Sequence, residues 1–241
     1  MKRKADYGFD APITVATFMI LGSALVGVGI LLVEGVFILP FSFLDPASFV
    51  GMGLGFMIPG SWMIVGSRFL KFRTRDRLLQ KLDLRGTERT LDVGCGRGLL
   101  LNGTAKKLTT GKAFGVDIWQ TEDQSGNDPT VTLENAEREG VAGKVHIVTG
   151  DARKLPFEKN TFDAVTSSWA IHNIRNRKER ESALSEMIRV LKPEGKIALL
   201  DIKFGPQYDL YFKGRSDVTF EKSGVDLTFL TPGYLFLVTK K

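Results

Sequence analysis

The chain has 241 residues, of which 43% are hydrophobic and 25% charged, and its formal net charge is +6. Its single cysteine, Cys95, cannot form an internal disulfide, and two histidines and one cysteine at unrelated spacings do not form a metal site. The net positive charge comes largely from the flanks of two apolar segments, which lack the aromatic and basic pattern of nucleic-acid grooves, so nucleic acid is not an expected partner.

Two apolar runs open the chain, at 13–39 and 47–66, separated by a turn at 40–46 that contains two prolines. A helix needs roughly 20 apolar residues to cross a bilayer, and both runs reach that length. A cleaved signal peptide has a shorter apolar region, and a soluble core hairpin would show a polar stripe at helical period. We therefore predict a two-helix transmembrane anchor over 1–67.

Small residues in these runs are spaced for close contact between two helices. Ser23 and Gly27 lie on the first run, and Gly51 and Gly55 lie on the second. Glu34 is interpreted as an interfacial carboxylate that reaches the headgroups, with a functional intramembrane acid as the alternative.

Lysine and arginine flank both runs, whereas the turn at 40–46 has neither. By the positive-inside rule we expect an integral membrane protein with both termini and the following domain in the cytoplasm. Residues 68–86 are predicted as a basic juxtamembrane helix or linker, which either merges into the next domain or lies on an anionic membrane surface. The flanking cations are Lys2, Arg3, Lys4, Arg68, Lys71, Arg73, Arg75 and Arg77.

Residues 91–98 read Leu-Asp-Val-Gly-Cys-Gly-Arg-Gly and predict a buried strand, a glycine turn and a helix start. Glycines permit positive φ and let a ligand approach the backbone, while the helix N-terminus offers free N–H groups. A dinucleotide fingerprint requires its third glycine where Leu99 stands, but the acid expected about 20 residues on is present as Asp117. The stretch predicts a cradle for a nucleotide-like cofactor.

Strands and helices alternate from Thr87 onward, which predicts an α/β fold with a doubly wound, mostly parallel seven-stranded sheet. Thr231-Pro232-Gly233 supplies the turn for an antiparallel last pair. Ligands of such sheets bind at the carboxyl ends of the strands. The predicted strands are 90–94, 113–117, 145–149, 163–168, 196–201, 225–230 and 234–239, and the predicted helices are 98–108, 130–140 and 178–191.

Asp92 in the first strand, the glycine turn and the Asp117 that closes the second strand together resemble the class I S-adenosylmethionine-dependent methyltransferases. The resemblance covers residues 87–241 and implies a Rossmann-like methyltransferase domain. The nearest subgroup looks like the small-molecule methyltransferases typified by quinone-ring C-methyltransferases. Further landmarks are Gly150-Asp151-Ala152, Leu155-Pro156-Phe157, Phe162-Asp163-Ala164-Val165 and the segment 189–196, in which Glu194 replaces a glycine usual in the family.

The resemblance implies S-adenosyl-L-methionine as the cofactor and assigns its contacts residue by residue. Asp92 and the backbone of Gly94 and Gly96 are expected to hold the methionine end. Asp117 is expected to bind the ribose hydroxyls. The remaining predicted cofactor-binding residues are Ile118 packing on the adenine, Asp151 and Ala152 at the adenine edge, and Ser168 at the end of the fourth strand.

His172 follows the fourth strand, where acceptors meet the methyl group in this family, and is either a catalytic base or a positioning residue. The polar segment 119–130 is either a solvated loop or a lid. Only 203–217 remains as an insertion that could form an acceptor pocket.

We therefore predict a membrane-anchored methyltransferase for a small acceptor, with a lipid-like molecule as one candidate. The alternative is a membrane-bound cofactor-binding or interaction module without catalysis.

Overall fold

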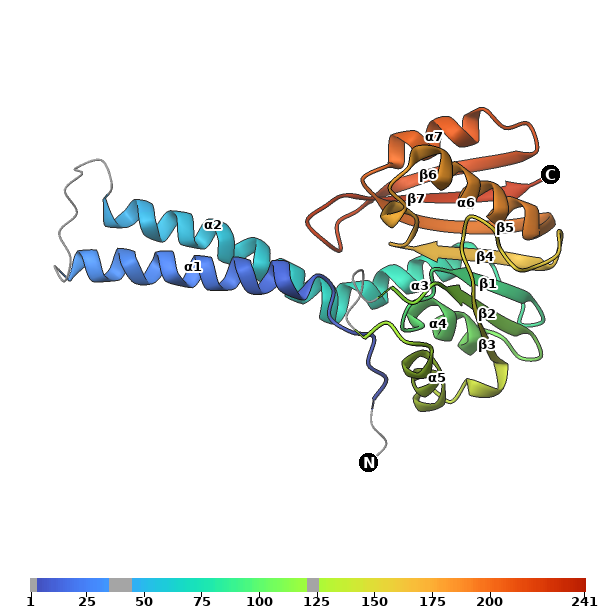
Figure 1. Ribbon diagram of the computed structural model, residues 1–241, viewed down its shortest axis with the longest axis horizontal. Helices are drawn as coiled ribbons and strands as arrows, with labels where there is room; N and C mark the ends of the chain where they lie inside the picture. The colour runs from blue at the N-terminus through green and yellow to red at the C-terminus, as the bar shows by residue number, and fades with distance from the viewer. Residues whose placement is uncertain (1–3, 35–44, 121–125) are drawn as a thin grey trace. The chain divides into compact units, whose positions relative to one another are not determined.

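The computed structural model describes residues 4–34, 45–120 and 126–241, which belong to two compact units (Figure 1). One unit is Phe9–Leu70, and the other combines the residues up to Gly8 with Lys71–Lys241. The sequence predicted an anchor over 1–67, a linker over 68–86 and a domain over 87–241. The observed units instead assign the N-terminal residues and the helix after Leu70 to the unit that contains the sheet.

The unit Phe9–Leu70 contains α1 (Pro12–Val33), α2 (Pro46–Val65) and the π-helix η1 (Gly66–Leu70). Both long helices have proline in the first turn, where its missing N–H has no helical partner. By length and composition, two helices of the described residues could cross a membrane, Pro12–Val33 and a continuous helix Pro46–Lys81. The predicted turn at 40–46 lies mostly outside the described residues.

Glycines bring α1 and α2 into backbone contact. A Cβ built at Gly22 would lie 2.8 Å from the Gly53 carbonyl oxygen, and one built at Gly53 would lie 2.6 Å from the Gly22 oxygen. A Cβ at Gly29 would lie 2.9 Å from the Pro46 oxygen, and one at Gly60 would press on Met19. Each helix therefore presents two glycines seven residues apart to the other, which is the period of left-handed helix pairs.

The prediction that Gly27, Gly51 and Gly55 form the contact was wrong. A Cβ at any of the three would have no neighbour within 4 Å, and Ser23 is exposed. The predicted and the observed small residues both have spacings that suit helix contact. Only the observed ones lie on the face that packs against the other helix.

Replacing Gly53 by valine is expected to destabilise the hairpin by about 1–3 kcal/mol, because the new side chain would overlap the α1 backbone. Titration of the detergent-solubilised protein with SDS, followed by circular dichroism, measures the loss of helix pairing. Gly55→Val is the matched control on the same helix and is expected to unfold like the wild type. Equal sensitivity of the two variants would contradict the observed packing.

The sheet has seven strands in the order β3-β2-β1-β4-β5-β7-β6, with β1 to β5 parallel and β7 antiparallel to both neighbours. This confirms the predicted doubly wound α/β sheet with a terminal hairpin. The strands are β1 (Arg89–Val93), β2 (Lys112–Asp117), β3 (Val145–Thr149), β4 (Phe162–Ser168), β5 (Leu191–Ile202), β6 (Val218–Asp226) and β7 (Gly233–Lys240).

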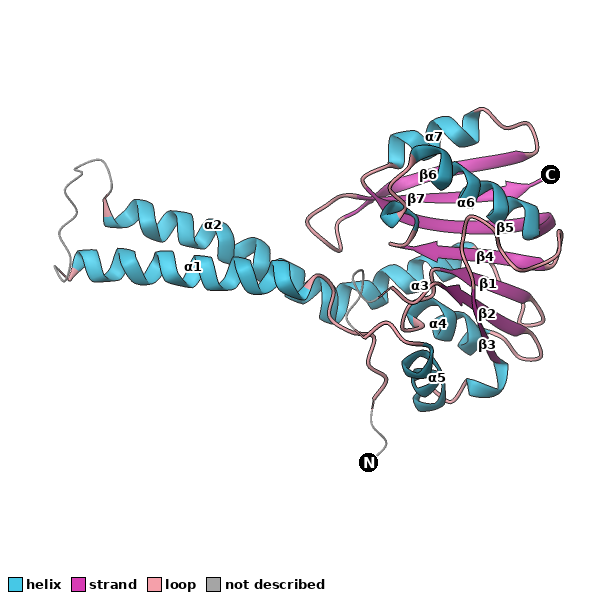
Figure 2. Ribbon diagram, viewed as in Figure 1, coloured by secondary structure: helices cyan, strands magenta, loops and turns pink. Residues whose placement is uncertain are grey.

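Helices cover both faces of the sheet (Figure 2). Leu199 on β5 packs in one cluster with Met187 and Phe212, whereas the next residue, Leu200, packs in another with Leu79. Both leucines are fully buried, as expected of a strand covered on two sides. The helices of this unit are α3 (Lys71–Lys81), α4 (Leu99–Lys107), α5 (Pro129–Arg138), α6 (Arg177–Val190) and α7 (Gly205–Lys213), with short 3-10 turns η2 (Ala142–Lys144) and η3 (Ile171–Asn173).

One predicted strand after β5 was wrong. The predicted strand 225–230 is instead the end of β6 and a following loop. The segment 203–217 contains α7, and its contribution to an acceptor pocket stays a prediction. β6 is the last strand of the sheet and pairs on one side only, so its sequence is polar and gives a weak strand signal. The apolar residues after it attracted the strand assignment, yet Leu227 and Leu230 are exposed.

Candidate cofactor and acceptor site

The glycine turn after β1 has the backbone that the sequence predicts. Gly94, Gly96 and Gly98 have φ values of 71°, 48° and 85°, which lie in the left-handed region. A Cβ at Gly94 would also collide with the Cβ of Ala170. The turn therefore requires glycine both for its backbone conformation and for the close approach of Ala170, and Gly98 starts α4 without a side-chain cap.

Asp92 lies under this turn in the middle of the sheet. Its side chain is almost fully buried and accepts a hydrogen bond of 2.8 Å from Thr166 Oγ1 on β4. Burial raises the pKa of Asp92 to about 7. A nearby cation stabilises the charged form of such a buried carboxylate. The methionine end of the expected cofactor carries an ammonium group that could be this cation.

The raised pKa of Asp92 predicts a pH-dependent stability. Between about pH 4 and pH 7 the folded state binds a proton that the unfolded state has released, so the free energy of unfolding falls as pH rises and levels off above pH 7. At about 1.4 kcal/mol per pH unit the loss amounts to roughly 4 kcal/mol. Asp92→Asn is expected to remove this slope in urea titrations of the cofactor-free protein between about pH 5 and pH 7. An unchanged slope would contradict the assignment.

Asp117 ends β2 and joins it to the glycine turn. Its Oδ2 accepts from the Gly96 N–H at 2.8 Å, and its Oδ1 accepts from the Trp119 N–H at 2.7 Å and from Asn127 Nδ2 at 3.2 Å. Each carboxylate oxygen has more than one acceptor position, so a ribose hydroxyl can still donate to it. Ile118, the residue predicted to pack on adenine, has 46% of its side chain exposed.

Asp151 and Ala152 follow β3 at the same end of the sheet, where the Gly150 N–H donates to the Asp117 carbonyl at 3.0 Å. The Asp151 carboxylate is bound by the guanidinium of Arg153, which lowers the pKa of Asp151. The structure thus brings Asp151 beside β2, with its carboxylate already held by a cation. Its role at the adenine edge stays a prediction.

Ser168 ends β4, and its Oγ is buried without a hydrogen-bond partner among the described residues. Leaving a buried hydroxyl unpaired costs free energy, so such groups in native proteins are usually satisfied by water or a ligand. The unpaired Ser168 hydroxyl lies beside the glycine turn. A polar ligand at the carboxyl ends of β1, β2 and β4 would give it a hydrogen-bond partner.

His172 lies in η3, directly after β4. Its Nδ1 is 2.6 Å from Oδ1 of Asp201, which is fully buried at the end of β5. Asp201 also accepts from the Ile202 N–H and from the Tyr208 hydroxyl, each at 2.9 Å. A buried carboxylate acceptor fixes a proton on Nδ1 and leaves Nε2 free to accept one. The same carboxylate stabilises the imidazolium that forms when Nε2 is protonated.

Sequence reasoning found His172 but missed Asp201 and Tyr208. The sequence contained a signal for Asp201, because it is an acidic residue after the apolar run of β5. Asp92 and Asp117 have similar positions near the ends of β1 and β2. Tyr208 lies in α7, which the sequence analysis left as an insertion.

The family model described as "Methyltransferase domain" matches residues 91–199. Demethylmenaquinone methyltransferase from Staphylococcus aureus is 34% identical over 146 residues, which cover 58% of this chain and 56% of that protein. Over these residues the chain therefore resembles S-adenosylmethionine-dependent methyltransferases. The chain spans little more than half the length of the curated relatives it matches.

Solved structures show the same fold. The YcgJ protein from Bacillus subtilis has a TM-score of 0.58 at 17% identity and covers 70% of this chain and 98% of its own. A geranyl diphosphate methyltransferase in complex with the cofactor has a TM-score of 0.56 at 15% identity, over 72% of this chain and 86% of its own. The methyl donor of the family is S-adenosylmethionine, and the glycine turn, the acids Asp92 and Asp117 and the unpaired Ser168 hydroxyl fit it.

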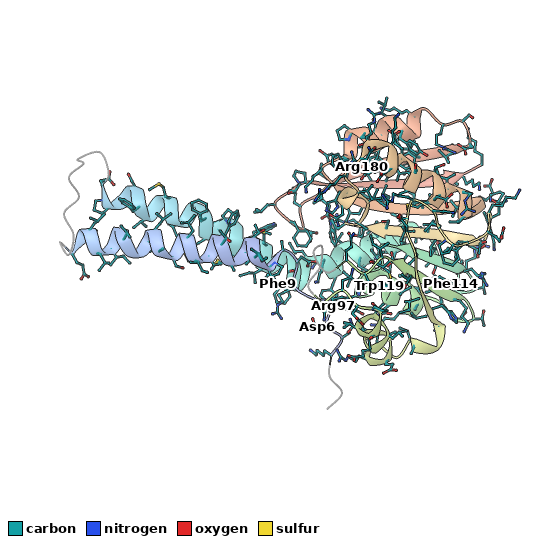
Figure 3. The ribbon with its side chains drawn as sticks, viewed as in Figure 1. Asp6, Phe9, Arg97, Phe114, Trp119 and Arg180 are labelled. Atoms are coloured by element: carbon teal, nitrogen blue, oxygen red, sulfur yellow. The ribbon has the colours of Figure 1, made fainter. Side chains whose placement is uncertain are left out.

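The N-terminal residues brace the glycine turn of the methyltransferase domain. The Asn135 side chain pairs with the Asp6 backbone through two 2.8 Å hydrogen bonds and donates to the Arg97 carbonyl at 3.0 Å. The Arg97 guanidinium forms a 2.9 Å ion pair with the Asp6 carboxylate (Figure 3). The sequence analysis built the cofactor site only from residues after 90. These partners are more than 90 residues from Asp6, and no local pattern signals them.

Cys95 lies inside the glycine turn, between Gly94 and Gly96. Burial raises the pKa of the Cys95 thiol, and a Cβ at Gly115 would lie 2.8 Å from Cys95 Sγ, so a small buried side chain is what fits there.

The segment 119–130 has residues 121–125 outside the described part of the chain. Both the interpretation of this segment as a solvated loop and its interpretation as a lid therefore stay predictions.

Proposed function

We propose that the chain is a membrane-anchored methyltransferase that moves a methyl group from S-adenosylmethionine to a small lipophilic acceptor, with a quinone-like ring as the candidate class. The observation that carries the proposal is the His172–Asp201 pair at the same sheet end as the glycine turn. The similarity to demethylmenaquinone methyltransferases supports the acceptor class.

The exposure of the hairpin supports the membrane anchor. Within the unit Phe9–Leu70, Ile13 and Ile20 are 82% and 71% exposed, and Ile58 is 67% exposed. A core hairpin of a soluble protein would bury such side chains, whereas lipid would cover them.

The domain itself supports a hairpin topology. Lys71 Nζ donates to the carbonyls of Tyr7 at 3.0 Å and Gly8 at 2.8 Å. These residues directly flank the unit Phe9–Leu70 in sequence, so a chain that enters the bilayer after Gly8 must return on the same side. The basic flanks assign that side to the cytoplasm.

The chemistry follows from an in-line displacement at the methyl carbon. When bound, the cofactor supplies an electrophilic methyl group on a sulfonium. The glycine turn and Asp117 position it, and enforced proximity of the two reactants lowers the barrier. His172 Nε2 takes the proton that the acceptor releases, while Asp201 holds the imidazole in the required tautomer.

Calorimetry of the purified protein in detergent tests the cofactor, and protease added outside intact cells tests the topology. We expect the wild type to bind S-adenosylmethionine and the methyltransferase domain to survive the protease. Absence of binding would refute the enzymatic proposal, and digestion of the domain from outside would refute the cytoplasmic orientation.

A further inference from the structure

The end of β6 and the loop that joins it to β7 form an exposed apolar tip, residues 225–232. Val225, Leu227 and Leu230 are 55%, 58% and 45% exposed. The one charged residue of the tip, Asp226, is buried. Figure 1 shows the tip extending past the strand ends, and the pairing of Ile202 with Gly233 places it at the carboxyl end of β5, beside the candidate site.

Buried hydrogen bonds hold the tip against the first turn of α3. Thr74 Oγ1 donates to Asp226 Oδ2 at 2.9 Å and lies 2.6 Å from Thr228 Oγ1. The Thr228 N–H donates to Asp226 Oδ1 at 2.9 Å. Thr74 follows Leu70, the last residue of the apolar hairpin unit, by four positions, or roughly 6 Å of helix. The tip is therefore fastened where the chain leaves its proposed anchor.

Cations border the tip. The Arg77 side chain is 60% exposed and lies 3.4 Å from Asp226, and the exposed Lys222 lies 4.8 Å from the centre of the Tyr234 ring. An uncharged apolar surface bordered by cations is typical of segments that rest in the boundary between lipid headgroups and acyl chains. A bilayer matches this surface better than a protein partner, because the tip exposes no charge that would select one.

The inner side of the tip contacts the acceptor side of the domain. The Phe229 ring packs edge-on against Trp169, with ring centres 5.1 Å apart. Trp169 lies between Ser168 at the end of β4 and His172 in η3. One short loop thus presents aliphatic side chains outward and an aromatic ring toward the site.

We propose that the tip 225–232 inserts into the cytoplasmic surface of the bilayer and forms the route by which a lipophilic acceptor reaches Trp169 and His172. This inference rests on the proposed function, because it assumes that the hairpin anchors the chain in a membrane.

An environment-sensitive NBD label on an introduced cysteine tests insertion. In nanodiscs of anionic phospholipid, NBD on Leu230→Cys is expected to emit roughly threefold more strongly than the same label on Leu210→Cys and to be quenched by acyl-chain spin labels. Leu210→Cys on α7 is the matched control, since Leu210 is also exposed and the native Cys95 is buried in both variants. Identical, water-like emission at the two positions would overturn insertion.

A double variant tests the route. Leu227→Asp with Leu230→Asp is expected to raise the KM for a vesicle-borne hydroquinone roughly tenfold and to leave the Kd of S-adenosylmethionine and the turnover of a short-chain water-soluble hydroquinone unchanged. Leu210→Asp is expected to change none of these. An unchanged KM for the vesicle-borne hydroquinone would overturn the route. Failure of the wild type to enter nanodiscs would overturn the membrane anchor itself, and with it this inference.

Discussion

His172→Ala is expected to lower kcat by roughly 10²- to 10⁴-fold, the usual contribution of a general base, and to leave the Kd of S-adenosylmethionine close to that of the wild type. The imidazole is held by Asp201 at the end of β5, whereas the glycine turn follows β1 and Asp117 ends β2. Steady-state transfer of labelled methyl groups, together with calorimetry, separates the two effects.

Variants of the supporting residues sharpen this test. Asp201→Asn removes the negative charge and introduces an amide N–H that can donate to Nδ1. It is expected to lower kcat nearly as much as His172→Ala, because the imidazole loses the preferred tautomer. Tyr208→Phe keeps the buried ring, removes one donor to Asp201, and is expected to lower kcat only a fewfold. Full turnover by His172→Ala would show that the histidine only packs.

Asp117→Ala is expected to weaken binding of S-adenosylmethionine by about 1.5–3 kcal/mol, which is a roughly 10- to 150-fold increase in Kd. The loss has two sources. The ribose hydroxyls lose a charged acceptor, and the N–H groups of Gly96 and Trp119 lose the carboxylate that orders the turn. Isothermal titration calorimetry measures the change directly.

Asp209→Ala is the matched control for this variant. Asp209 forms an ion pair with Lys213 on the surface of α7, and exposed pairs contribute little. Its removal is expected to leave the Kd unchanged. Wild-type affinity in Asp117→Ala would reject the assignment of the ribose-binding residue.

The order and type of most elements were readable because their signals are local. The glycine turn, Asp92 and Asp117 all lie within 27 residues, and short apolar strands alternate with helical segments. The signals failed where a long-range partner decides the outcome. The residues after β6 read as a strand from their apolar sequence, yet they leave the sheet, because Asp226 and Thr228 bind Thr74 some 150 residues earlier.

The same limit applies to the site and to the hairpin. Asp201 is a strand-end acid like Asp117, but only the fold shows that it meets His172. Asp6 and Asn135 are 129 residues apart, so their pairing has no sequence pattern. In the hairpin, the spacing of Gly51 and Gly55 is as suitable as that of Gly53 and Gly60, and only the α1 surface selects the second pair.

The most direct measurement is transfer of the labelled methyl group of S-adenosylmethionine by the full chain in nanodiscs that contain the reduced, hydroquinone form of a quinone with an unsubstituted ring position. The account predicts a labelled product in the lipid extract whose mass exceeds that of the quinone by one CH₂, and predicts that His172→Ala binds the cofactor but forms little of this product. Cofactor binding by the wild type without any methylated product, from the quinone or from a total membrane extract, would contradict it.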